Sequence, residues 1–195
     1  MHIISHRINT LDQLKNTPSN LGVEVDIRSY GENLIMHHDP FKQGECFEDW
    51  LKSYQHGTLI LNVKEEGLEG RLLSLMAQHN IEDFFFLDQS FPFLRRTVAM
   101  GEKRCAVRVS EYESIETTLS LSGMVEWVWV DCFTRFPLSS EEAAQLKSAG
   151  FKLCFVSPEL QGRTERTHVM EFRRKIELLS INGDAVCTKY PDLWG

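Results

Sequence analysis

Residues 22–28, Gly-Val-Glu-Val-Asp-Ile-Arg, are the most informative segment of the chain. Apolar β-branched residues alternate here with Glu24 and Asp26, and residues two apart in a β-strand point to the same face. Two neighbouring carboxylates repel each other and are costly to bury unpaired. A divalent cation that prefers oxygen ligands, Mg²⁺ or Ca²⁺, removes both difficulties. The alternative is a half-exposed edge strand with a polar face.

Further polar groups flank this stretch on both sides. Ser-His-Arg at residues 5–7 follows a short apolar run, and His-His-Asp-Pro at residues 37–40 follows a second one. Histidine, arginine and paired carboxylates gathered so early in the chain suit phosphate chemistry. If the strand continues through His37 and His38, the two rings face opposite sides, so only one of them can serve a site.

Length and composition limit the class of protein. The chain has 195 residues, enough for one domain with a real core, and we assign residues 1–195 to a single domain. A net charge of −7 argues against binding to nucleic acid or anionic membranes. We expect a cytoplasmic protein, because there is neither a stretch that could span a membrane nor a signal-peptide pattern. The five widely spaced cysteines include no C-x-x-C pair, so we expect reduced core thiols.

Strand-like and helix-like segments alternate along the chain. Short apolar runs predict strands at residues 3–5, 22–28, 34–37, 58–63, 84–88, 105–109, 127–131, 153–157 and 185–188. Helical spacing and capping residues predict helices at 67–79, 110–120 and 165–181, one starting near 91, and one from 139 or 140 to 150.

This alternation predicts a parallel sheet. Without residues 34–37, which read as a hairpin partner, eight strands remain, and they suggest a (β/α)₈ barrel. That fold typically needs about 250 residues, with about 200 near the lower limit. We therefore expect a minimal barrel with degenerate or missing connecting helices, for example at residues 9–21. The alternative is an open doubly wound sheet, although no Gly-rich phosphate loop follows the first strand.

Polar residues recur where the predicted strands end, which is the active-site face of such a barrel. They are Ser5, His6, Arg7, Glu24, Asp26, Lys64, Asp88, Arg108, Asp131, Ser157 and Glu159.

The ordered motifs resemble the glycerophosphodiester phosphodiesterase group, part of the superfamily of phosphatidylinositol-specific phospholipase C-like phosphodiesterases. His-Arg near the N-terminus is followed by Gly-x-Glu-x-Asp and then by a strand ending in His-Asp. Residues 61–64, Leu-Asn-Val-Lys, are similar to a strand with a metal-binding Glu two residues before a Lys. Residues 187–192 are similar to a closing Thr-Asp-x-Pro motif.

The resemblance implies a role for each matching position. His6 and His38 would form the general acid/base pair. Arg7 and Lys64 would hold the phosphate, and the metal ligands would be Glu24, Asp26 and Asn62. The possible pocket residues are Asp88, Arg108, Trp129, Asp131 and Glu159.

Several positions depart from the family pattern. Ile8 stands where a Gly usually follows His-Arg, Asn62 replaces the third carboxylate, and Lys189 replaces the closing Asp. The insertion that often follows His-Asp is short.

Some positions have alternative interpretations. Glu65, Glu66, Asp88 or Asp131 could supply the missing charge, and Asp88 and Asp131 could instead be structural caps. Asp39 could orient an imidazole, although we favour a turn with Pro40. Trp129 could pack in the wall, and Glu159 could belong to a turn.

The predicted function is metal-dependent cleavage of a small soluble glycerol- or sugar-linked phosphodiester by His/His acid-base catalysis. The product would arise by hydrolysis or by cyclising transfer. A non-catalytic barrel that binds a phosphorylated ligand is the main alternative. A metal-dependent C–N hydrolase has less support, because no His-x-His follows the first strand. The sequence does not indicate the oligomeric state.

Overall fold

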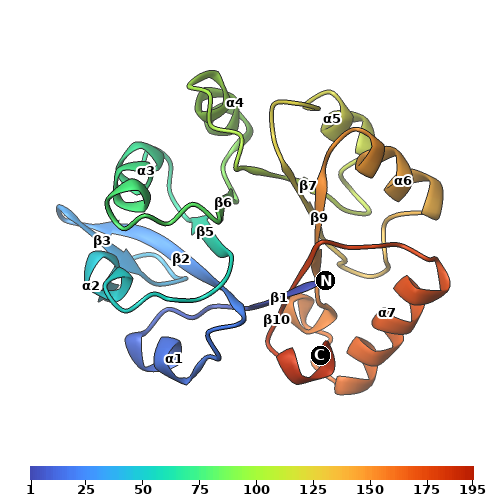
Figure 1. The fold of residues 1–195 in the computed structure, drawn as a ribbon, viewed down its shortest axis with the longest axis horizontal. Helices are drawn as coiled ribbons and strands as arrows, with labels where there is room; N and C mark the ends of the chain where they lie inside the picture. Colours follow the sequence, from blue (N-terminus) through green and yellow to red (C-terminus); the bar gives the residue numbers. More distant parts are fainter. The chain divides into compact units, whose positions relative to one another are not determined.

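The computed structural model describes all 195 residues. The chain forms two compact units, which we call the N-terminal unit (residues 5–102) and the C-terminal unit (residues 1–4 and 103–195). Figure 1 shows strands alternating with helices along the chain in both units. The predicted α/β class is confirmed.

The sheet of the N-terminal unit has the strand order β4-β3-β2-β5-β6. Its strands are β2 (Gly22–Tyr30), β3 (Asn33–Met36), β4 (Glu45–Cys46), β5 (Leu59–Val63) and β6 (Phe84–Leu87). Strands β2, β5 and β6 are parallel, whereas β3 returns antiparallel to β2 as the predicted hairpin. The helices are α1 (Leu11–Asn16), α2 (Phe47–Leu51), α3 (Glu69–Gln78) and α4 (Phe91–Ala99).

Strand β2 is central and buried on both faces. The apolar side chains at positions 23, 25 and 27 are fully buried, and so are Glu24 and Asp26. The alternative of a half-exposed edge strand is therefore wrong: Glu24 and Asp26 are buried, and β2 has strand partners on both edges, with β5 pairing at residues 23–27 and β3 at residues 27–30. Fully buried carboxylates need partners from the protein or from a ligand.

The C-terminal unit continues the parallel pattern. Its strands follow the order β1-β10-β9-β8-β7, with β1 at His2–Ser5, β7 at Ala106–Val109, β8 at Trp127–Val130, β9 at Lys152–Val156 and β10 at Ala185–Thr188. Its helices are α5 (Ile115–Leu119), α6 (Ser140–Ser148) and α7 (Arg166–Leu178), with 3₁₀ turns at Pro158–Gln161 and Pro191–Leu193.

The nine strands predicted from apolar runs all exist, within one or two residues at each end. Strand β4 and helix α2 were not predicted, because two and five residues are too short for a periodic pattern. All five cysteines are free, four of them buried, as expected for core thiols. No helix has both the length and the apolar character that crossing a bilayer requires.

Glu111 fixes the loop that follows β8. Its Oε1 accepts hydrogen bonds from the backbone N–H groups of Thr134 and Arg135 at 2.6 Å each, and its Oε2 accepts one from Phe133 at 3.1 Å. Burial alone would raise the pKa of Glu111, but these backbone hydrogen bonds outweigh it and lower the pKa to about 2. Because the folded pKa is depressed, this stabilisation is present above pH 4.5 and lost as the pH falls toward 2.

We therefore expect Glu111→Gln to lower the free energy of unfolding at pH 7 by only about 1 kcal/mol, since Glu111 is partly exposed and its charge is partly screened by solvent. Urea unfolding at pH 7 and at pH 2.5 checks this. The difference from wild type is expected to shrink at the lower pH, and an equal difference at both pH values would contradict the electrostatic explanation.

Candidate functional site

The acidic pair on β2 is satisfied by groups of the N-terminal unit. The Asn62 side-chain amide donates a hydrogen bond to Glu24 Oε1 at 2.8 Å. The backbone N–H of Arg7 donates to Glu24 Oε2 at 2.7 Å. The parallel register sets Asn62 of β5 opposite Asp26 of β2, which explains why its amide reaches both carboxylates.

Asp26 has four contacts from side chains. Its Oδ2 accepts a hydrogen bond from Asn9 Nδ2 at 2.8 Å and lies 3.3 Å from Arg7 Nε. Its Oδ1 lies 3.3 Å from Lys64 Nζ and accepts a longer bond of 3.4 Å from Asn62 Nδ2. Every oxygen of the acidic pair therefore faces a donor of the chain itself.

Asn9 was missed by the sequence analysis. Its amide group makes a reciprocal pair with Asp26, donating to the carboxylate and accepting from the Asp26 backbone N–H at 2.9 Å. A lone Asn in a loop carries no signal of such a role, because loop side chains are placed only by tertiary structure.

Burial changes the protonation of Glu24. Desolvation and the charge of Asp26 raise the pKa of Glu24 to about 7, against the lowering effects of Asn62, Lys64 and the Arg7 backbone N–H. Near neutral pH the pair thus carries fewer than two negative charges, which eases its burial.

Two histidines of the predicted site have carboxylate neighbours. His6 Nε2 lies 3.7 Å from Glu24 Oε2. His38 is half-exposed, and its Nδ1 lies 2.9 Å from Asp39 Oδ1. The hydrogen bond from His38 lowers the pKa of Asp39. Asp39 therefore contacts the imidazole, the alternative that the sequence analysis did not favour over a turn.

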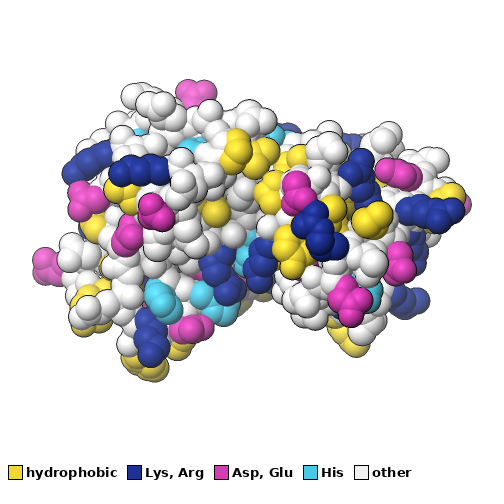
Figure 2. Space-filling view, turned by 90° about the horizontal axis from the view of Figure 1, so that it is seen from below, with side chains coloured by type: hydrophobic (Ala, Val, Ile, Leu, Met, Phe, Trp, Pro, Cys, Tyr) yellow, Lys and Arg dark blue, Asp and Glu magenta, His cyan; other side chains and the backbone are white.

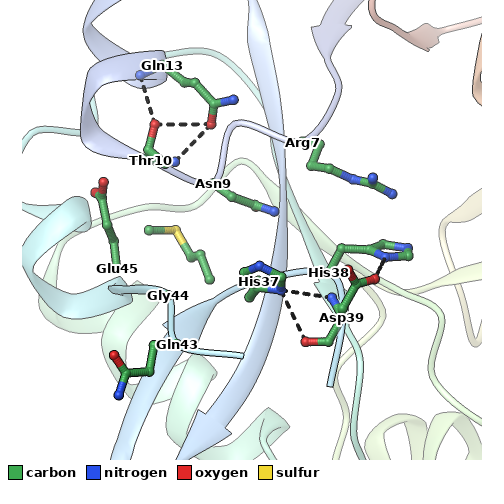
Figure 3. A pocket seen from close by; sticks show the side chains of 11 residues that line it. Arg7, Asn9, Thr10, Gln13, His37, His38, Asp39, Gln43, Gly44 and Glu45 are labelled. Atoms are coloured by element: carbon green, nitrogen blue, oxygen red, sulfur yellow. Dashed lines mark hydrogen bonds and ion pairs between the residues drawn. The ribbon is translucent and has the colours of Figure 1, made fainter. Parts of the chain in front are cut away.

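A pocket of about 610 Å³ opens beside these groups, and Figure 3 shows the side chains around it. Its lining residues are Arg7, Asn9, Thr10, Gln13, Met36, His37, His38, Asp39, Gln43, Gly44 and Glu45. His37 lines it too, although we expected only His38 to face a site. On one face of the molecule histidine side chains gather beside basic and acidic ones (Figure 2). The mixture of amide, hydroxyl and charged groups suits a polar ligand.

Gly44 closes this pocket through a tight backbone contact. A Cβ at Gly44 would overlap the backbone carbonyl oxygen of Met36. We expect Gly44→Ala to displace the segment before β4 and to weaken ligand binding in the pocket by about tenfold, with a smaller effect on the catalytic step. Steady-state kinetics on a diester of the class that the sequence predicts check this, with Gly70→Ala as the control, since no atom lies within 4 Å of a Cβ at Gly70. Unchanged KM in Gly44→Ala would contradict the prediction.

Lys64 lies between two acidic residues. Its Nζ is 3.3 Å from Asp26 Oδ1 and 3.1 Å from Asp88 Oδ2. Asp88 thus lies with the predicted site and holds Lys64. Glu65 accepts a hydrogen bond from the backbone N–H of Ser29 instead of facing the acidic pair.

The remaining pocket candidates belong to the C-terminal unit and form contacts of their own. Asp131 is fully buried, pairs with Arg108, and accepts a hydrogen bond from Gln161 Nε2 at 2.6 Å. Buried Glu159 accepts hydrogen bonds from the Thr188 hydroxyl at 2.6 Å and the Lys189 backbone N–H at 2.8 Å. The indole of Trp129 is buried on β8. These contacts satisfy both carboxylates within the unit.

The donor set does not fit a divalent cation as it stands. Asn62 stands where the third carboxylate was expected, and the nearby Asp88 is paired with Lys64. No group of three or more His, Cys, Asp or Glu residues has the geometry to hold a metal ion. Asn62 presents its N–H groups to the acidic pair, whereas its Oδ1 is buried without a hydrogen-bond partner. Metal ligands must be acceptors. The predicted Mg²⁺ or Ca²⁺ site at Glu24, Asp26 and Asn62 stays an untested prediction.

The arrangement described so far is that of an α/β protein with an acidic pair on a central strand and with two basic groups and two histidines beside carboxylates. Solved structures with the same fold include two proteins of Agrobacterium tumefaciens str. C58. One is assigned to the glycerophosphoryl diester phosphodiesterases (TM-score 0.70, 14% identity, 99% of this chain and 95% of that chain covered). The other is a glycerophosphodiester phosphodiesterase (TM-score 0.67, 12% identity, 100% and 98% covered).

A glycerophosphoryl diester phosphodiesterase from Parabacteroides distasonis is also similar (TM-score 0.65, 13% identity, 98% of this chain and 84% of that chain covered). No family model matches the chain. No curated protein matches it in sequence. The resemblance that the ordered motifs predicted is thus confirmed at the level of the fold.

Proposed function

We propose that this chain cleaves a small soluble phosphodiester, linked to glycerol or a sugar, by His/His acid-base catalysis on a minimal (β/α)₈ barrel. The observation that carries the proposal is the convergence of His6, Arg7 and Lys64 on the Glu24–Asp26 pair. The similar solved structures described as glycerophosphodiester phosphodiesterases support the reaction class.

The two histidines divide the proton transfers. The Asp39 carboxylate accepts from the Nδ1 side of His38, which leaves Nε2 of that ring able to take a proton from the attacking hydroxyl. His6, held beside Glu24, gives a proton to the leaving alkoxide. The nucleophile is water or a neighbouring hydroxyl of the substrate, so the product is a phosphomonoester or a cyclic phosphate.

Arg7 and Lys64 bind the phosphoryl oxygens. Both cations contact Asp26, and their side chains remain 40% and 15% exposed, so a ligand can reach them from solvent. Charge-assisted hydrogen bonds from such groups stabilise the extra negative charge of a phosphoryl transition state. The polar pocket at His37 and Gln43 holds the alcohol part of the substrate.

A panel of phosphodiesters, including bis(p-nitrophenyl) phosphate and glycerol- and sugar-linked diesters, tests this function. Turnover of at least one natural diester is the expected result. A non-catalytic phosphate-binding barrel is the second candidate, favoured by the Asn62 amide in place of a carboxylate. Saturable binding of a phosphorylated compound without any product from the panel would establish that second function.

A further inference from the structure

Two side chains of the protein, Lys64 and Arg7, place positive charge beside the Glu24–Asp26 pair. Lys64 Nζ and Arg7 Nε each lie 3.3 Å from a different oxygen of Asp26. Lys64 is held from its other side by Asp88, at 3.1 Å, and its side chain is only 15% exposed. A cation held at both ends and largely removed from water interacts strongly with the carboxylate beside it.

From this arrangement we propose that Lys64 and Arg7 take the place of a divalent cation, so that the site binds a phosphoryl group without Mg²⁺ or Ca²⁺. A metal ion on the Asp26 oxygens would lie within a few ångströms of both cations and would have to displace them. The repulsion between such neighbours is large in a partly buried site.

Asn62 agrees with this assignment. Its neutral amide donates to Glu24 at 2.8 Å and to Asp26 at 3.4 Å, and thereby links the two carboxylates without adding charge. A carboxylate at position 62 would add a further buried negative charge beside the Glu24–Asp26 pair. Asn62 thus makes a metal site weaker, and it suits a site in which Lys64 and Arg7 offset the negative charge.

The part of this inference that concerns metal binding is independent of the proposed function, whereas the part that concerns phosphate rests on it. The two are separated by measuring metal binding in the absence of any substrate. Isothermal titration of Mg²⁺ and of Ca²⁺ into the wild-type chain, with thermal unfolding at millimolar metal, provides that measurement. We expect no binding heat and no change in Tm.

A variant designed to bind metal serves as the positive control, because it shows that the titration can detect metal binding at this site. Lys64→Met/Asn62→Asp removes the resident ammonium and supplies the third carboxylate, so we expect it to bind Ca²⁺ and to gain several degrees in Tm at about 100 times its Kd. Lys52→Met is the matched control, because the exposed Lys52 pairs with exposed Asp49 and not with the acidic pair. It should behave as wild type does.

Saturable Mg²⁺ or Ca²⁺ binding to the wild-type chain, weakened in Glu24→Gln, would overturn the inference. If the double variant does not fold, the wild-type titration alone still decides between the two outcomes. If the wild type binds no metal and cleaves no diester, the inference on charge stands and the proposed function fails.

Discussion

Replacing His6 or His38 by alanine is expected to lower kcat at least about 100-fold, the usual loss for a general acid or base. His6 is partly buried beside Glu24, and His38 is held by Asp39 at the rim of a polar pocket. Neither ring packs in the apolar core, so both variants should fold. Single-turnover kinetics on the diester found active, with circular dichroism of each variant, make the measurement.

His79→Ala is the matched control for these two variants. His79 is the C-cap residue of α3 and does not line the pocket, so its replacement should leave kcat within about twofold of wild type. A near-wild-type kcat in His6→Ala or His38→Ala would remove that histidine from the mechanism. Equal losses in all three variants would point to a folding defect instead.

Replacing Arg7 by glutamine is expected to cause a second large loss, this time in kcat/KM. Arg7 takes a left-handed backbone conformation, with φ at 59°, which directs its N–H toward Glu24 while its guanidinium lies beside Asp26. Loss of a charged hydrogen bond to phosphate typically costs about 1.5–3 kcal/mol, or roughly 10- to 150-fold in kcat/KM. Gln removes the charge and also shortens the side chain.

Chemical rescue with free guanidinium ion tests whether the positive charge of Arg7 is what the reaction needs. Added guanidinium ion should restore part of the kcat/KM of Arg7→Gln and have no such effect on wild type. The matched control is Arg71→Gln, because Arg71 pairs with exposed Glu48 outside the candidate site. An Arg7→Gln variant as active as Arg71→Gln would show that Arg7 does not hold the phosphate.

Most of the strands could be predicted from the sequence, because a short buried strand forms a distinct apolar run bounded by turn residues. Strand β2 was predicted to within two residues at its end, since alternating β-branched residues and the following turn mark it clearly. Helix α1 was expected only as a degenerate segment at residues 9–21. Its capping box, Thr10 with Gln13, could have predicted where it starts.

The candidate site was predicted less completely than the fold. Motif order brought Glu24, Asp26 and Lys64 together correctly, because parallel strands end at the same edge of a sheet. Motif order could not reveal that Asn62 donates hydrogen bonds to the carboxylates instead of coordinating a metal through its oxygen. An Asn side chain can do either, and the residue type alone does not distinguish the two roles. The direction of a side chain depends on its neighbours in space.

Phosphorus NMR of the wild-type chain in excess EDTA, incubated with glycerol- and sugar-linked phosphodiesters, tests the central claim that this site cleaves phosphodiesters with its own charged groups. We expect the diester signal to be replaced by that of a phosphomonoester or a cyclic phosphate, and the His6→Ala/His38→Ala variant to leave it unchanged. A diester signal that persists with wild type in EDTA would contradict the claim, whether or not the signal disappears when Mg²⁺ or Ca²⁺ is added.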